Sequence, residues 1–284
     1  MNLCSPQEIK DLLARHGFHF SKSMGQNFLI ADWVPVQLAE EDKLGPDCGV
    51  LEVGPGIGSL TVQLAQRARK VVSVELDPSL LPILSETLNG YENVEIVPGD
   101  IMKLNLPRLL DEKLDGLRPV VCANLPYNIT TPVLTKLLEC RRFSSITVMI
   151  QKEAAQRICA GPGADDYGHF SLLCQYFARC ETLFNVAPSC FLPPPKVTSE
   201  ILRMTPHSSP LLPPEEEKTF LTLIRSAFAQ RRKTLLNALS SAFSNRFSKD
   251  ELRQCLTDSG LPETVRGEKL SLDEFMLLAK HLTK

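Results

Sequence analysis

Glycines and acidic residues follow three apolar, strand-like segments of the chain, at the point where each segment ends. Gly54 and Gly56 follow the first segment, Glu75 ends the second and Asp100 follows the third. A glycine-rich turn lets a ligand approach the backbone closely, and ligands of open α/β sheets bind at the carboxyl ends of the strands. Because carboxylates accept hydrogen bonds from ribose hydroxyls and from adenine amines, the pattern predicts an adenosine-type site.

The spacing of Gly54, Gly56 and Gly58 departs from the dinucleotide pattern G-x-G-x-x-G, which disfavours a pyrophosphate ligand. A single glycine turn or strand-end acid is more often a structural cap than a ligand contact. Three of them at successive strand ends favour a binding site. Leu76 and Ile101, each next to one of the acids, are expected to line it.

A fourth strand-like segment ends in Asn124-Leu125-Pro126-Tyr127. The exocyclic amine of adenine is a poor nucleophile, and acceptors such as the Asn124 amide oxygen and the Leu125 carbonyl would draw it toward an attacking geometry. Pro126 fixes the turn, and Tyr127 offers an aromatic face for an extruded base. The alternative is a simple turn with a packed tyrosine. The pattern predicts that a group is transferred to the adenine amine from a donor in the neighbouring site. Correct positioning of donor and amine would suffice for this transfer, without a general base or metal.

The elements that must position these groups form a doubly wound α/β domain. Strands are expected at residues 50–53, 71–74, 94–97, 119–123 and 146–150, with helical spacing between them, for example at 59–69. The apolar run at 170–177, the triple proline at 193–195 and the strand-like run at 196–204 indicate a hairpin-like edge that completes the sheet.

A Pro- and Ser-rich stretch at residues 205–214 divides the chain into two predicted domains, residues 1–205 and 206–284. Helical patterns beginning at 220 and spanning 249–256 and 272–282 predict a small all-helical C-terminal domain.

The bulk composition excludes several classes of protein. The chain has 284 residues, of which 43% are hydrophobic and 23% charged, as in ordinary globular proteins. No apolar run approaches the ~18 residues of a membrane helix, and no signal peptide is evident. The nine cysteines form no CxxC pair and the histidines no HExxH spacing. We expect a cytoplasmic monomer with reduced thiols and without a metal or membrane anchor.

Positive charge is concentrated in one segment although the net charge is −2. Residues 225–253 hold seven basic and two acidic side chains, so the local net charge is 7 − 2 = +5. The candidates for phosphate contact are Arg225, Arg231, Arg232 and Lys233. A solvated helix face is the competing interpretation.

Several motifs resemble one known family. The residues are KSMGQNFL at 22–29, NLPY at 124–127, QKE at 151–153, FLPPPKV at 191–197 and FAQRRKTL at 228–235. They resemble the ribosomal RNA adenine dimethylases, and the likeness covers nearly the whole chain. Relatives often carry more basic residues before the GQNFL run, where Ser23 and Met24 follow Lys22 here.

The resemblance implies a Rossmann-like class I methyltransferase that uses S-adenosylmethionine. It implies N6,N6-dimethylation of two adjacent adenosines in a 3′-end hairpin loop of small-subunit (16S) RNA, with a role in subunit biogenesis and an assembly intermediate as partner. Asn27 and Leu29 would contact the cofactor, and Asn124 would border both cofactor and base. Phe191 would sandwich the base with Tyr127, although a core phenylalanine is the alternative.

Other functions stay open at this point. An erythromycin-resistance type of enzyme shares the motifs and acts on large-subunit RNA. A binding factor for ribosome assembly or a mitochondrial-type transcription factor would not depend on catalysis. A DNA adenine methylase would need a target-recognition region, and an NAD-dependent oxidoreductase would leave Asn124 to Tyr127 without a task.

Overall fold

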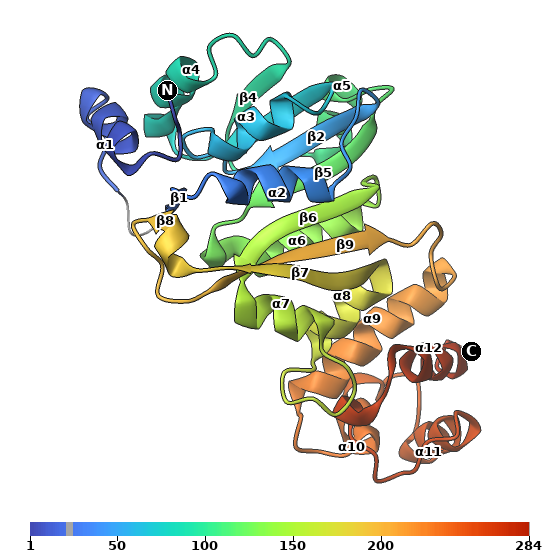
Figure 1. Cartoon of the computed structure of the whole chain (residues 1–284). Helices are drawn as coiled ribbons and strands as arrows, with labels where there is room; N and C mark the ends of the chain where they lie inside the picture. Colours follow the sequence, from blue (N-terminus) through green and yellow to red (C-terminus); the bar gives the residue numbers. More distant parts are fainter. Residues whose placement is uncertain (21–24, 284) are drawn as a thin grey trace. The chain divides into compact units, whose positions relative to one another are not determined.

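The computed structural model of the chain describes residues 1–20 and 25–283 (Figure 1). The residue contacts divide the chain into two compact units. The first unit comprises Met1–Ala155 and Glu181–Pro206, and the second comprises Gln156–Cys180 and His207–Lys284. The sequence-predicted division near residue 205 stays a prediction, and the contacts group residues 156–180 with the C-terminal helices.

A seven-stranded sheet forms the centre of the first unit, in the order β4-β3-β2-β5-β6-β9-β7. Neighbouring strands from β4 to β6 pair in parallel, and β9 pairs antiparallel to β6. The strands are β2 Cys48–Val53, β3 Lys70–Glu75, β4 Val94–Pro98, β5 Arg118–Asn124, β6 Ser145–Gln151, β7 Ala178–Val186 and β9 Ser199–Pro206. The five strands predicted from the sequence and the parallel α/β architecture are confirmed.

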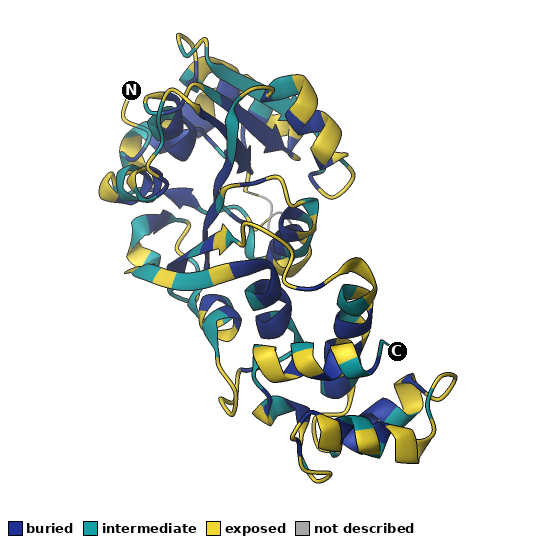
Figure 2. Cartoon of the chain, turned by 90° about the vertical axis from the view of Figure 1, so that its right-hand side faces the viewer, coloured by how far each residue is buried: buried dark blue, intermediate teal, exposed yellow. Residues whose placement is uncertain are grey.

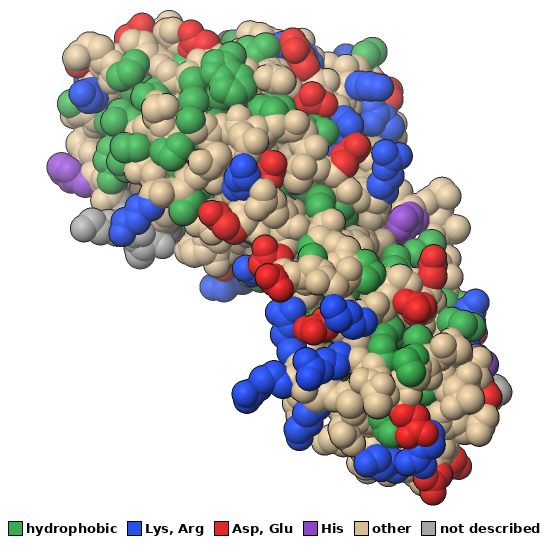
Figure 3. All heavy atoms as spheres, turned by 60° about the horizontal axis from the view of Figure 1, so that its bottom comes forward, with side chains coloured by type: hydrophobic (Ala, Val, Ile, Leu, Met, Phe, Trp, Pro, Cys, Tyr) green, Lys and Arg blue, Asp and Glu red, His purple; other side chains and the backbone are tan. Residues whose placement is uncertain are grey.

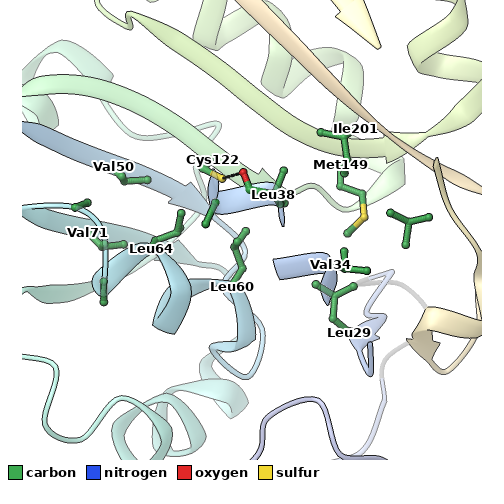
Figure 4. Close-up of a cluster of buried hydrophobic side chains, with 14 of the residues drawn as sticks. Leu29, Val34, Leu38, Val50, Leu60, Leu64, Val71, Cys122, Met149 and Ile201 are labelled. Atoms are coloured by element: carbon green, nitrogen blue, oxygen red, sulfur yellow. Dashed lines mark hydrogen bonds between the residues drawn. The ribbon is translucent and has the colours of Figure 1, made fainter. Parts of the chain in front are cut away.

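Helices cover the sheet because its central strands are apolar on both faces; all six residues of β2 are buried. The helices of the first unit are α1 Pro6–Arg15, α2 Trp33–Glu41, α3 Ser59–Ala65, α4 Leu81–Thr87, α5 Leu106–Lys113 and α6 Thr130–Cys140. Helix α7, Lys152–Cys159, begins in the first unit and ends in the second. Figure 4 shows Leu60 and Leu64 of α3 packed beside Val50 and Val71 of the sheet. In Figure 2 the buried colour runs through the central strands.

The edge of the sheet differs in detail from the sequence prediction. The apolar run at 170–177 is not part of the edge but forms helix α8, His169–Phe177, and the strand β7 follows it. Buried, half-exposed and exposed residues are mixed in β7, so it lacks the regular alternation that identifies a strand in a sequence. The predicted strand near the triple proline is present as β9.

The second unit is built from α8, α9 Pro214–Ala229, α10 Leu235–Ala242, α11 Lys249–Asp258 and α12 Leu272–His281. Its centre is aromatic: the rings of Tyr176 and Phe220 stack with centroids 4.5 Å apart. The Tyr176 hydroxyl donates to Glu217 (2.8 Å) and the Tyr167 hydroxyl to the Leu270 carbonyl (2.8 Å), so both buried phenols are satisfied. The sequence pattern missed α10.

No helix in the described ranges is both long and apolar enough to cross a bilayer.

One buried carboxyl group links three elements of the first unit. Glu52 lies near the end of β2, and its Oε2 accepts hydrogen bonds from Thr61 Oγ1 of α3 (2.8 Å) and Ser73 Oγ of β3 (2.6 Å). Burial raises the pKa of Glu52 to about 7, and the nearby Glu75 carboxyl acts in the same direction.

This pKa makes stability depend on pH. Between the unfolded pKa near 4.5 and the folded value near 7, the native state binds more protons than the unfolded state, so stability falls as pH rises through this window. We expect Glu52→Gln to gain stability relative to the parent protein as pH rises from 5 to 7, by at most about 1.4 kcal/mol for each pH unit, and the difference to level off above pH 7.

Urea unfolding at a series of pH values measures the difference. The exposed Glu92→Gln is the control, and its difference from the parent should change little over the same range. Parallel stability curves for Glu52→Gln and the parent would contradict the prediction.

Candidate functional site

The carboxyl ends of β4, β3, β2 and β5 meet at one edge of the sheet and surround a pocket. Every residue predicted to bind the cofactor lines it: Asn27, Leu29, Gly54, Gly56, Glu75, Leu76, Asp100, Ile101 and Asn124. Leu125, Pro126 and Tyr127 line it as well. The structure thus brings together side chains that are up to a hundred positions apart in the sequence.

The glycine turn after β2 depends on conformations that side chains rarely adopt. Gly54 has φ +71° and Gly56 φ +61°. A Cβ atom on Gly56 would lie 3.3 Å from the Phe28 ring, and one on Gly54 would lie 3.7 Å from Pro126 Cδ. The turn therefore runs close to both the N-terminal segment and the Asn124–Tyr127 turn, and its positive φ angles favour glycine at both positions.

Glu75 lies at the end of β3 with its carboxylate held by two backbone amides. Oε1 accepts from Asp77 N (2.8 Å) and Oε2 accepts from Gly56 N (3.3 Å). Burial raises the pKa of Glu75, while these two amides oppose the rise. The side chain is thereby oriented in the pocket, and each oxygen keeps a lone pair for a further donor.

The loop after β4 is fixed from two sides. Asp100 Oδ1 accepts from Met102 N (2.9 Å), and Lys136 Nζ of α6 donates to the Met102 carbonyl (2.7 Å). Directly after Glu75 in the sequence, Leu76 lines the pocket with 51% of its surface exposed. Together with Ile101 it supplies an apolar surface suited to a flat ring.

Sequence reasoning missed a contact that ties the N-terminal segment to this site. Gln26 Nε2 donates to Asp77 Oδ2 (2.6 Å), and Asp77 Oδ1 accepts from Ser79 N (2.9 Å). The only sequence signal for this contact is that Asp77 lies two residues after Glu75, at the same strand end. The segment continues into β1, Phe28–Leu29, whereas Lys22, Ser23 and Met24 of the predicted motif lie outside the described residues.

The Asn124–Tyr127 turn is positioned by backbone contacts. Leu125 N donates to the Met149 carbonyl of β6 (3.1 Å), and the 3₁₀ turn Tyr127–Ile129 follows at once. The Tyr127 hydroxyl lies 2.6 Å from Ser199 Oγ. Within the described parts of the chain, no hydrogen bond occupies the Asn124 side chain, so its amide is available to a ligand in the pocket.

Phe191 differs from the other predicted site residues because it does not line the pocket. It is 2% exposed and belongs to a core cluster with Leu29, its partner in the antiparallel pairing of β1 with β8, Phe191–Leu192. Its predicted stacking on a base stays a prediction, and its position matches the alternative of a core side chain.

The basic candidates of the second unit differ from one another. Arg231 Nη2 donates to the Asp165 and Tyr167 carbonyls (3.0 and 3.1 Å), and Arg231 lies 3.6 Å from the Glu268 carboxylate. Arg232 and Lys233 are exposed and form no ion pair with any carboxylate of the described chain, and the same holds for Arg225. Figure 3 shows Lys and Arg side chains gathered on one face of this unit.

A family model and similar curated proteins point to the same family. The family model described as ribosomal RNA adenine dimethylase matches residues 17–284. The Ribosomal RNA small subunit methyltransferase A of Alkaliphilus oremlandii is 44% identical over 283 residues, covering 99% of this chain and 98% of the relative. The protein of the same name from Bacillus cytotoxicus is 44% identical over 285 residues, covering 99% and 97%.

Two solved structures share the fold at higher divergence. A dimethyladenosine transferase from Plasmodium falciparum has 28% identity and a TM-score of 0.75, covering 88% of this chain and 95% of that one. The 23S rRNA methyltransferase ErmE has 26% identity and a TM-score of 0.70, covering 90% and 100%. The whole-chain match to the family model confirms the resemblance found in the sequence motifs, and the chain belongs to the ribosomal RNA adenine dimethylase family.

Proposed function

We propose that the protein transfers methyl groups from S-adenosylmethionine to N6 of two adjacent adenosines in the 3′-end hairpin of small-subunit ribosomal RNA. One observation carries the proposal: Asn124 and Tyr127 border the same pocket as Gly54, Glu75 and Asp100. A donor held by the glycines and acids would lie next to a base held by the turn. We further propose that it acts as a cytoplasmic monomer on an assembling subunit.

The pocket residues fit the cofactor chemically. Gly54 and Gly56 leave space over the backbone, which a Cβ atom would fill. The oriented Glu75 carboxylate is suited to ribose hydroxyls, and Asp100 with Leu76 and Ile101 is suited to an adenine ring. Asn27 and Leu29 line the pocket from the N-terminal segment. S-adenosylmethionine, when bound, supplies a methyl group already activated on a sulfonium.

The turn after β5 supplies the groups that act on the target base. The Asn124 amide oxygen and the Leu125 carbonyl accept hydrogen bonds from the exocyclic amine, which reduces the conjugation of its lone pair with the ring. Tyr127 stacks on the extruded base and holds it in line with the methyl donor. The amine loses its proton to solvent after transfer, so no general base is required.

The second unit supplies charge for the RNA backbone. Arg225, Arg232 and Lys233 are exposed, and an exposed cation without an internal partner gains most from a phosphate contact. Arg231 has three internal oxygen partners, which favours a structural task for it.

Sequence identity to known relatives favours small-subunit RNA over large-subunit RNA as the substrate. Relatives named for the small subunit are 44% identical to the chain, whereas the 23S rRNA methyltransferase ErmE is 26% identical.

Transfer of labelled methyl groups to isolated subunits tests the substrate. We expect unmethylated small subunits to acquire N6,N6-dimethyladenosine, identified by mass, while large subunits incubated in parallel acquire no label. Label in the large subunit alone would assign the enzyme to the resistance type. Absence of label on both would favour a binding factor.

Asn124→Ala and Glu75→Ala should separate catalysis from cofactor binding. Loss of the Asn124 amide removes an acceptor used in the transition state, so we expect kcat to fall roughly 100-fold or more. Binding of S-adenosylmethionine, measured by calorimetry, should weaken more in Glu75→Ala than in Asn124→Ala. Normal turnover of Asn124→Ala with saturating cofactor would refute the role of this amide.

Replacing Arg232 and Lys233 by Ala should weaken RNA binding and flatten its salt dependence, by about one unit of log–log slope for each phosphate that the variant no longer neutralises. Filter binding at several salt concentrations measures the slope. Arg231 is left intact because its removal would also release the Asp165 and Tyr167 carbonyls.

The control for this experiment removes the same charge elsewhere. Lys10 and Lys280 are exposed and lie outside the basic segment, so Lys10→Ala/Lys280→Ala should leave the slope nearly unchanged. An equal change in the two double variants would identify Arg232 and Lys233 as part of a solvated face.

A further inference from the structure

The ring of Tyr127 is held at both ends. At the backbone end, Leu125 N donates to the Met149 carbonyl (3.1 Å) and Ile129 N donates to the Pro126 carbonyl (3.2 Å), so the turn that carries the ring is fixed. At the other end, the hydroxyl lies 2.6 Å from Ser199 Oγ. A tyrosine held at one end only could still rotate about its side-chain torsions.

Ser199 is a rigid partner for this hydroxyl. It is the first residue of β9, is fully buried at 0% exposure, and pairs with Gln151 in the β6–β9 ladder. Burial raises the pKa of Tyr127, so the phenol stays protonated at neutral pH, and either of the two hydroxyls can donate in this bond. Ser199 itself does not line the pocket, although Tyr127 does.

We propose that Ser199 is a positioning residue for methyl transfer, which sets the tilt of the Tyr127 ring against the target base. The inference rests on the proposed function, because it needs a base stacked on Tyr127. Neither the sequence motifs nor the names of the relatives give Ser199 a task. Without its hydroxyl partner the ring would sample more orientations, and a stacked base would reach the in-line geometry less often. The loss therefore falls on kcat rather than on cofactor binding.

A double-mutant cycle tests the proposal, because each end of the bond can be removed alone. Ser199→Ala and Tyr127→Phe should each lower kcat on small subunits, roughly tenfold, with little change in affinity for S-adenosylmethionine. The double variant should be no slower than either single variant, since the same hydrogen bond is absent from all three. Effects that multiply in the double variant, or wild-type turnover in either single variant, would overturn the proposal.

The control variant is Ser171→Ala. Ser171 is equally buried, and in the second unit its hydroxyl donates to the Arg157 carbonyl (2.6 Å) and accepts from Gly168 N (3.1 Å). It reports the general cost of losing a buried serine hydroxyl, which thermal unfolding measures, and its kcat should stay near that of the parent.

A second readout does not require activity. In protein labelled with ¹³C-tyrosine, the Tyr127 ring, assigned from the Tyr127→Phe spectrum, should show changed shifts or broadening in Ser199→Ala and none in Ser171→Ala. An unaltered Tyr127 signal in Ser199→Ala would overturn the inference. If the parent protein still methylates small-subunit RNA, the proposed function would stand in that case. A parent protein that methylates no RNA would overturn the proposed function and, with it, the catalytic part of the inference.

Discussion

The parallel pairing of β2 with β3 and β5 is the constraint on which the site depends. Leu51 of β2 lies opposite Val72 of β3 and Val121 of β5, so the three strands end at nearly the same level. Whatever residues follow these strands must then meet, however distant they are in the sequence. Hydrogen bonds between backbones set this register, and the buried apolar side chains of both sheet faces keep it from slipping.

The register alone would leave the loops after the strands loose, and polar contacts beneath and beside the pocket hold them. Glu52 joins β2 to α3 and β3 under the glycine turn, and Lys136 holds the loop after β4 through the Met102 carbonyl. Burying the Glu52 carboxyl costs stability at neutral pH, because its raised pKa opposes ionisation. This destabilising group lies next to the pocket, where the loops must keep one geometry for the in-line transfer that we propose.

The strands and the pocket residues were predictable because their signals are local. Apolar segments of four or five residues predict β2 to β6. Glycines or acids directly after a strand end can be recognised without information about distant partners. The strand β7 was missed because its sequence carries no clear period. Helix α10 was missed although its buried apolar residues, Leu235, Leu236, Ala238 and Leu239, follow helical spacing. Arg231 and Arg232 look alike in the sequence. Only the fold shows that Arg231 meets the Asp165 and Tyr167 carbonyls.

Phe191 stays a predicted stacking partner, although in this conformation it belongs to the core. Its ring is buried beside Leu29, and the pairing of β1 with β8 fixes both backbones. Moving the ring into the pocket would expose it and leave a gap against Leu29, at a cost of roughly 2–3 kcal/mol in apolar burial. Tyr127 needs no such movement, because it lines the pocket and its hydroxyl is already held. In the function that we propose, Tyr127 can meet a base without rearrangement, whereas Phe191 could do so only at the expense of its contacts in the core.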